Sequence, residues 1–486
     1  MGKVKIVRSA LIREWISSFP KDTYSSNGKI IYCQKCKQQI PCDRLSHLKQ
    51  HHESSKHQNN SSLHIHGKQQ FIDLTAGEIE LDTFSEDLCD ALVGANIPLK
   101  KIDNPSFRYF LQKYCRRNIP SEATVRKQLK TCYEATISRI KKKLSNGYCW
   151  VSVDESTDMS GHSVANLLVG RLDPDKFFAP HLVSVKFLEK TNHATISRFV
   201  LDGLREIGVK EECVLHLVTD GASYMTKSAR DVLSALMPNM THTTCLCHGL
   251  NRVAEEVRAC FPEVDLLISN VKKVFTKAPS RVRQYKEMLP FLSLPPQPIL
   301  TRWCTWLNAA SFYADNFQQI KEVIESFDSE DAACISKSKE IFKNINVSQQ
   351  LAYIKSNFSI ISTSIKELES QGLPLLRVLD ILADTKEKLT SARGDVGLIV
   401  QHKMTSILEK NPGITRLTEV AKILAGEPSD LVMAPDMIAA LKYAPMTSCD
   451  VERTFSVYKN IFTDRRCSFT EENLEMYVIC NCERRE

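Results

Sequence analysis

The fold is decided by residues 148–158, which read YCWVSVDESTD. The first half of this stretch is apolar, with aromatic and β-branched residues, and predicts a buried strand. The second half is acidic and hydroxylated, so we expect the strand to end by placing Asp154 in a polar site. Residues 213–225, CVLHLVTDGASYM, repeat the pattern. This second apolar strand ends on Asp220, before a glycine that allows a tight turn and before Ser223, which we expect to cap a helix.

Two aspartates at matching strand ends allow two interpretations. An aspartate in this position most often accepts hydrogen bonds from nearby backbone amides, and so closes a turn or caps a helix. Carboxylates on neighbouring strands are also what a divalent-metal site needs. The pairing of Asp154 with Asp220, and a third acid near the C-terminus, favour the metal site. We assign the neighbouring Glu155 and Asp158 to hydrogen bonds within their own loop.

The composition is that of an ordinary globular protein. At 486 residues the chain has room for a large core, and we expect about two to four domains. No apolar run approaches the roughly 18 residues of a membrane span, and the first residues lack the apolar segment of a secretory signal. We therefore expect no membrane partner. Without an export signal, the 17 cysteines indicate thiols and metal ligands rather than disulfides.

The net charge of +7 conceals an asymmetry along the chain. Residues 1–150 contain 25 lysines and arginines against 14 acidic residues, whereas residues 151–486 contain 39 against 43. A basic N-terminal third favours a polyanion as partner, and nucleic acid is the usual one. A solvated basic surface without a partner is the alternative interpretation of the charge.

A zinc finger is predicted near the N-terminus. An amphipathic helix over residues 9–19 and a short strand at 29–32 lead into Cys33 and Cys36, whose C-x₂-C spacing suits one Zn²⁺. Four histidines follow as candidates for the remaining ligands: His47, His51, His52 and His57.

Two histidine spacings compete in this finger. His47 with His51 or His52 gives the common H-x₃₋₅-H pattern on a continuous helix. His51 with His57 gives C-x₂-C-x₁₄-H-x₅-H, which requires the last helix to distort so that both rings reach the metal.

Beyond a polar linker, the chain is expected to be helical and then to alternate between strands and helices. The helical region includes a long helix capped by Ser121 that ends at three lysines, 141–143. We predict the following elements after it: strands near 148–154, 163–172 and 181–188, a helix at 194–207, a strand at 213–219, a helix at 223–236, a short strand at 243–246 and a helix at about 249–276.

Two further motifs follow the second aspartate. Cys245 and His248 form a C-x₂-H turn. A second metal site is conceivable there, but no partner pair stands nearby, so we favour a structural or substrate-positioning role. Arg302 and Trp303 follow a proline-rich loop. Trp303 is either a core anchor or a stacking platform for an unpaired base, with Arg302 on phosphate. Residues 307–440 show only helical patterns.

The closing motif is MTSCDVERTFS, residues 446–456. On a helix, Glu452, Phe455 and Ser456 share one face, so Glu452 can point into a cleft while Phe455 packs the helix on the sheet. A glutamate followed by an arginine on a helix is normally a solvated pair. Here it is the candidate for the third acid.

These motifs resemble two known families. Residues 23–58 are similar to BED-type and CGG-repeat-binding zinc fingers, whose ending favours His51 and His57 as ligands. Roughly residues 20–482 resemble hAT-family transposases, through VDESTD, TDGAS, the C-x₂-H turn, the Arg-Trp pair and ER-x-FS in that order. The resemblance assigns Glu452 as the third acid.

The resemblance also implies an architecture. The domains expected from it, in chain order, are a BED-like finger at 1–60, a linker at 61–75, a helical DNA-binding or dimerisation region at 76–145, an RNase H-like α/β core at 146–306, an all-α insertion at 307–440, and the rest of the core with the hAT dimerisation region at 441–486. The first and fourth strands of such a core lie side by side, which would bring Asp154 and Asp220 together.

The implied activity is that of a DDE-type DNA transposase. Asp154, Asp220 and Glu452 would hold two Mg²⁺ or Mn²⁺ ions for DNA cleavage and strand transfer, and the finger would hold Zn²⁺. Double-stranded DNA, a homo-oligomer and a nuclear location go with that expectation. A domesticated hAT-derived DNA-binding regulator without transposition is the main alternative, favoured by an insertion shorter than the family's. A plain RNase H nuclease is a third, which the dedicated finger disfavours.

Overall fold

The computed structural model describes residues 8–21, 23–36, 38–41, 43–59, 83–299 and 302–483. The expected linker at 61–75 lies outside the described residues. The chain divides into two compact units, Met1–Asp82 and Thr83–Glu486, and each is described by itself. Among the described residues no helix has the length and apolar character required to cross a membrane.

The N-terminal unit is a small sheet with helices beside it. Its elements are α1 (Arg8–Ser17), β1 (Tyr24–Ser26), β2 (Ile31–Cys33), β3 (Gln38–Ile40), α2 (Leu45–Glu53) and α3 (Ser55–Asn59). The three strands are antiparallel in the order β1-β2-β3. Among the described residues, its hydrophobic core consists of six buried side chains: Ile12, Tyr24, Ile31, Cys33, Ile40 and Leu48. A core of this size needs an additional constraint such as a structural metal.

The second unit begins with helices. They are α4 (Phe84–Gly94), a 3₁₀ turn at Leu99–Asp103, α5 (Pro105–Cys115) and α6 (Glu122–Leu144). The predicted cap of the long helix is confirmed, since the Ser121 hydroxyl accepts a hydrogen bond from the Thr124 amide at 3.3 Å. The last turn of α6 carries the three lysines, where positive charge stabilises a helix C-terminus.

A five-stranded mixed sheet follows α6. Its strands are β4 (Tyr148–Thr157), β5 (Ser163–Leu172), β6 (His181–Leu188), β7 (Val214–Thr219) and β8 (Thr241–Thr244), in the order β6-β5-β4-β7-β8. β4 pairs with β5 and β5 with β6 in antiparallel fashion, whereas β7 runs parallel to both β4 and β8. The expectation that the first and fourth strands lie side by side is therefore confirmed.

The sheet separates two hydrophobic cores. Along β4, Trp150 faces a core shared mainly with the helices from α10 onward, whereas Val151 and Val153 face a core shared with α4, α6 and the last two helices. This alternation is the expected result of a strand buried on both faces. Gly170 lies opposite Trp150 on β5, and a Cβ at this position would collide with the indole ring.

Two predicted helices are interrupted. The helix expected at 223–236 is divided into α8 (Ser223–Ser228), a π-helical turn at Ala229–Leu233 and α9 (Ser234–Leu236). The helix expected at 249–276 is two helices, α10 (Leu246–Cys260) and α11 (Pro262–Phe275). The break falls at Phe261, because proline disfavours helical geometry in the residue before it.

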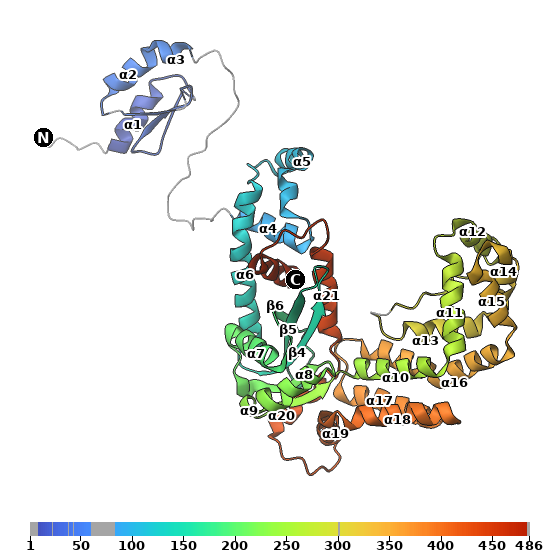
Figure 1. The fold of residues 1–486 in the computed structure, drawn as a ribbon. Coiled ribbons are helices and arrows are strands. Elements are labelled where there is room, and N and C mark those ends of the chain that lie inside the picture. Colours follow the sequence, from blue (N-terminus) through green and yellow to red (C-terminus); the bar gives the residue numbers. More distant parts are fainter. Residues whose placement is uncertain are drawn as a thin grey trace. The chain divides into compact units, whose positions relative to one another are not determined.

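The remainder of the unit is helical. The further elements are α7 (His193–Ile207) between β6 and β7, and then α12 (Pro279–Met288), α13 (Thr305–Asp315), α14 (Phe317–Glu325), α15 (Ala333–Lys343), α16 (Ile345–Leu368), α17 (Leu375–Thr390), α18 (Asp395–Glu409), α19 (Pro412–Leu424), α20 (Pro435–Ala440), α21 (Cys449–Ile461) and α22 (Glu471–Cys482). No strand occurs between 307 and 440, as predicted. In Figure 1, α21 returns to the sheet after the helices α11–α20.

Candidate functional site

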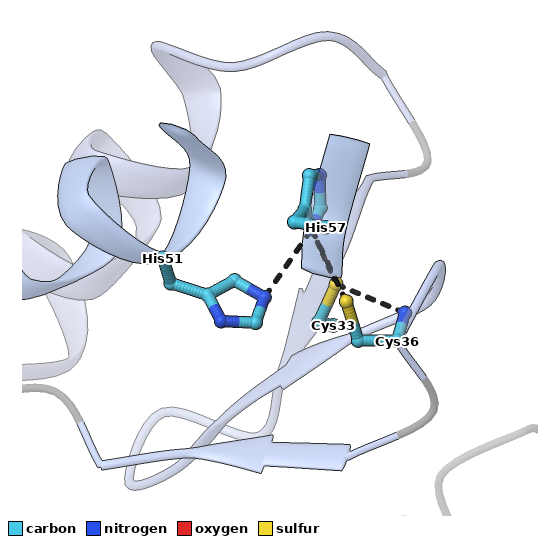
Figure 2. A group of neighbouring side chains, drawn as sticks. All are labelled: Cys33, Cys36, His51 and His57. Atoms are coloured by element: carbon cyan, nitrogen blue, oxygen red, sulfur yellow. Dashed lines mark hydrogen bonds between the residues drawn. The ribbon is translucent and has the colours of Figure 1, made fainter. Parts of the chain in front are cut away.

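The N-terminal unit brings two cysteines and two histidines together. Cys33 and Cys36 come from the end of β2 and the turn after it, His51 from α2 and His57 from α3, and Figure 2 shows the four side chains converging. The His57 Nδ1 atom lies 3.3 Å from the Cys33 sulfur and 3.4 Å from the Cys36 sulfur. The His51 Nε2 atom lies 3.2 Å from the same nitrogen.

These separations suit a tetrahedral zinc site. Zinc bond lengths to sulfur and nitrogen imply ligand-to-ligand edges of about 3.3–3.8 Å. Burial and the neighbouring His51 lower the pKa of His57 to about 4, and burial also lowers the pKa of His51. Both rings are thus neutral at pH 7, as a metal ligand must be. The cluster could bind zinc.

The other two histidines have different surroundings. His47 is exposed on α2 and is not part of the cluster. His52 is half-buried, and its Nδ1 atom shares a hydrogen bond of 3.1 Å with the Tyr24 hydroxyl. The helix distortion that the second spacing requires is present at Ser54. The extended backbone of Ser54 separates α2 from α3, and its hydroxyl donates to the His51 carbonyl and accepts from the His57 amide.

In the second unit, Asp154 carries an unsatisfied carboxylate oxygen. It lies near the end of β4, where its Oδ1 atom accepts a hydrogen bond from the Glu155 amide at 2.8 Å. Its Oδ2 atom is buried and has no hydrogen-bond partner among the described residues. Burial raises the pKa of Asp154 well above its ordinary value, and the nearby Glu452 and Asp220 raise it further. A buried acceptor without a donor is the environment that a bound cation would satisfy.

His248 and Glu452 complete a group around Asp154. One ligand atom from each of the three residues lies within 4.8 Å of the other two. His248 comes from the first turn of α10 and Glu452 from the first turn of α21, and their side chains approach to 3.6 Å. Burial opposes a charge on His248, but Cys245 and the two carboxylates outweigh it and raise its pKa to about 9. The two carboxylates of the group are donors that suit a divalent metal, and His248 and Glu452 are partly exposed to solvent.

Asp220 occupies a different position from the one expected. It is adjacent to the group and adds to the electrostatic load on Asp154, but it is not one of the three residues with converging ligand atoms. Its Oδ1 atom accepts a hydrogen bond from the Ala222 amide at 3.1 Å. Asp220 therefore closes the turn before α8. Ser223 makes no capping hydrogen bond there, so that prediction was wrong: the aspartate already binds the turn amide that leads into the helix.

The two acids that follow Asp154 differ from each other. Asp158 accepts hydrogen bonds from the amides of Ser160 and His162, both at 2.8 Å, so its assignment to the loop is confirmed. Glu155 instead accepts a hydrogen bond of 2.7 Å from the hydroxyl of Tyr224 on α8. Its assignment to the loop was wrong, because the strand continues past it to Thr157 and carries it beside α8.

Asn166 is a residue that the sequence analysis missed. It lies opposite Asp154 in the register of β4 and β5 and is fully buried. Its side-chain amide donates to the hydroxyl of Thr454 at 2.7 Å, two residues after Glu452 on α21. Asn166 thus attaches α21 to the sheet beside Asp154 and Glu452. The available signal was an amide inside the otherwise apolar stretch SVANLLVG.

The C-x₂-H turn fastens α10 to α21. The Leu246 amide donates to the Met446 carbonyl at 3.0 Å, and the Ser448 amide donates to the Cys245 sulfur at 3.2 Å. The Cys247 and Cys449 sulfurs lie 3.6 Å apart. This agrees with a structural role for Cys245. His248 does more than expected, because the same turn delivers its ring to the acids.

Trp303 also lies beside the group. Its ring meets that of His248 edge to face, with centroids 5.0 Å apart, and it is half-buried whereas Arg302 is exposed. Both residues line a hollow of about 590 Å³ that also includes Glu452 and Lys459. The tryptophan is therefore neither a fully buried anchor nor remote from the candidate site.

Comparison with known protein families found a match. Residues 120–279 match the family model described as "Domain of unknown function (DUF659)". This is the domain family associated with hAT transposases, so the match supports a hAT-like protein. The matched range extends from α6 through α11 and includes Asp154, Asp220 and His248. The comparison with curated proteins found no match.

Proposed function

We propose that the chain is a metal-dependent DNA transposase of the hAT type with an RNase H-like core. The strand order supports this architecture, since it places the first and fourth strands side by side. The observation that carries the proposal is the convergence of Asp154, His248 and Glu452 from β4, α10 and α21, around a buried oxygen without a partner. A bound cation would offset the cost of placing two carboxylates next to the buried Asp154 Oδ2 atom.

The proposed site uses Asp154 and Glu452 as metal ligands, with Asp220 beside them. A bound Mg²⁺ or Mn²⁺ would supply a Lewis acid for activating a water or a 3′-hydroxyl and for stabilising the leaving oxygen. Carboxylate donors suit either ion. His248 lies beside these acids, and the Trp303 ring meets its ring edge to face. The half-buried indole is also available for stacking on an unpaired base, with Arg302 nearby for phosphate.

The proposal includes partners and a location. Double-stranded DNA is the proposed substrate, a homo-oligomer formed through the C-terminal region is the proposed assembly, and the nucleus is the proposed location. The zinc-binding finger is proposed to recognise DNA. The support for these statements is the basic N-terminal third and the family match.

A single-turnover cleavage assay tests the proposal. The full chain is incubated with duplex and pre-nicked DNA in Mg²⁺ or Mn²⁺, and compared with Asp154→Asn, Asp220→Asn and Glu452→Gln. We expect each variant to lose cleavage by at least about a hundredfold while retaining DNA binding, because the changes remove metal ligands and leave the cationic surfaces intact. Cleavage that persists in Asp154→Asn would contradict the proposal.

A hAT-derived DNA-binding protein without cleavage activity is the second candidate. The observation in its favour is that Asp220 lies outside the converging group, while His248 approaches Glu452 and so offers positive charge to the acids without a metal. In the same assay this candidate predicts tight DNA binding by the wild-type chain and no cleavage in either metal.

A further inference from the structure

A hollow of about 560 Å³ adjoins the group of Asp154, His248 and Glu452, which we call the metal-binding group. We call it the basic groove. Five cationic side chains line it, and no acidic residue is among the described residues that do so. The cationic residues are Lys227, Arg230, Arg252, Lys403 and Lys410. His248 belongs both to the wall of this groove and to the metal-binding group.

Three helices each present one face to the groove. Thr226 and Lys227 on α8 are followed by Arg230 in the π-helical segment. From α18 and its C-cap come residues at spacings of three and four: Lys403, Ser406, Ile407 and Lys410. On α10, His248 and Arg252 are four residues apart and therefore share a face. Residues from these three helices thus line one concave surface, and His248 in its wall lies next to Asp154 and Glu452.

Three of the five cations have no counter-ion. Arg230 bonds to Asp231 at 2.6 Å and Lys403 bonds to Glu256 at 2.9 Å. Lys227, Arg252 and Lys410 form no ion pair with any described residue. All three side chains are exposed. Like charges gathered around a concave surface attract an anion.

The turn after β7 is shaped to admit Arg252. A Cβ at Gly221 would lie 2.7 Å from the Arg252 Nη1 atom, so the glycine leaves the space in which the guanidinium lies. This places the positive charge next to the turn that Asp220 closes, and Arg252 acts to lower the pKa of Asp220 against the dominant effect of burial. The wall of the basic groove therefore reaches the turn that contains Asp220.

We infer that the basic groove binds the sugar–phosphate backbone of the DNA strand that enters the metal-binding group. This inference rests on the proposed function. Lysine, arginine and hydroxyl side chains are the groups that contact phosphates, and no phenylalanine, tyrosine or tryptophan is among the described residues that line the groove. A separate hollow beside the group contains Trp303. The strand is thus held through its backbone in the basic groove, and a base can stack in the hollow that contains Trp303.

The test is the salt dependence of DNA binding by the full chain. The triple variant Lys227→Ala, Arg252→Ala, Lys410→Ala is compared with wild type and with the control Lys337→Ala, Lys343→Ala, Lys388→Ala, which removes the same charge from exposed positions on α15 and α17. The probe is a 30-nucleotide single strand, measured by fluorescence anisotropy with zinc but without Mg²⁺ or Mn²⁺.

We expect the groove variant to bind at least about tenfold more weakly at 0.1 M salt. Its plot of log K against log salt should be shallower by about 2, because each lost phosphate contact on a single strand removes roughly 0.7 from the slope. The control should bind like wild type. Equal slopes for the two triple variants would overturn the inference. The single variant Lys410→Glu, at an exposed position, repeats the test with minimal risk to folding.

Two further outcomes separate the groove from the proposed function and from a small-molecule site. A weakened groove variant beside a wild type that cleaves no DNA would support the groove and contradict the nuclease. If the groove variant binds DNA normally and the wild type cleaves it, the nuclease is supported and the role of the groove is contradicted. If inorganic pyrophosphate stabilises wild type against heat but not the groove variant, while both bind the single strand equally, the groove holds a small phosphate compound and the inference is wrong.

Discussion

Asp154 is held in an environment that disfavours its charge. Its carboxylate is almost fully buried, and one oxygen has no hydrogen-bond partner among the described residues. Burial raises the pKa of Asp154, and the nearby Glu452 and Asp220 raise it further. Such an arrangement lowers stability, and proteins retain it where a site requires it. In Asp154→Asn the charge is removed, while the new amide oxygen can still accept from the Glu155 backbone.

We predict that Asp154→Asn is more stable than wild type in metal-free buffer. The gain should be about 1–3 kcal/mol, the usual cost of an unsatisfied buried polar group, and differential scanning calorimetry measures it as a rise in Tm. The matched control is Asp158→Ala, which removes the acceptor of two backbone amides and should lower the Tm. A lower Tm in Asp154→Asn would show that the carboxylate is stabilised by contacts in the fold.

Single residues were predictable from the sequence where a strand or helix motif identified them. Asp154 and Glu452 are acids at expected positions in short motifs, and the structure brings them together. His248 and Asn166 were not predicted to join them, because their placement depends on the packing of α10 against α21 and on the register of β5. Helix packing and strand register are relations between separate elements, and local sequence patterns do not encode them.

Two alanine variants of the finger test which histidines bind zinc. His57→Ala should lose stoichiometric zinc, whereas His47→Ala should retain it, because His57 lies within reach of both sulfurs and His47 is not part of the cluster. Cys33→Ser should also release the metal and unfold the small core. Zinc content measured by mass spectrometry decides between the two spacings. Zinc loss in His47→Ala with retention in His57→Ala would reverse the assignment.

At the level of elements, β7 and β8 carry two histidines whose neutral forms the fold requires. His216 is fully buried and donates through Nε2 to the Pro445 carbonyl at 2.8 Å. Burial lowers the pKa of His216 to about 4, and it does the same for His242. In the unfolded chain these rings titrate near pH 6.5, so below that pH the unfolded state binds protons that the folded state does not.

Stability should therefore be full above pH 6.5 and decline as the pH falls toward 4. The loss is on the order of 3 kcal/mol for each histidine. The measurement is the Tm of the main transition between pH 7.5 and 4.5. In His216→Gln, which keeps an amide donor for Pro445 without a titrating ring, the slope should be reduced. An equal slope in wild type and variant would show that His216 is not the cause.

The strands of the large sheet were predicted more accurately than the helices around it. Residues 163–172 and 181–188 are strands with the expected bounds, because apolar runs ending at turns mark them clearly. The helix predicted at 249–276 was wrong at Phe261, where it breaks before Pro262, whereas residues 223–236 are helical as predicted but include a π-helical turn. Helical periodicity continues across both interruptions, so the pattern alone could not locate them.

For the whole molecule, the boundary between the units falls at residues 82 and 83. A division at residue 150, suggested by the charge asymmetry, would remove α4 and α6 from the core that they share with β4 and α22. We predict that the fragment 83–486 folds and that its duplex affinity is below that of the full chain, because it lacks the basic finger unit. Equal affinities would show that the finger adds nothing to binding.

Charge counts over long ranges also concealed the basic groove. Residues 151–486 contain more acidic than basic residues, yet five cations from three helices gather around one hollow. Folding brings the cations together, so this feature could not be derived from a net charge.

The central claim is that Asp154 and Glu452, beside His248, hold a divalent cation. The most direct test is Mn²⁺ binding to the zinc-loaded full chain, followed by the decrease of the free-ion signal in electron paramagnetic resonance. We predict saturable binding by wild type, weakened at least about tenfold in Asp154→Asn and in Glu452→Gln, and unchanged in Lys337→Ala. Equal Mn²⁺ binding by wild type and Asp154→Asn, or none by wild type, would contradict the account.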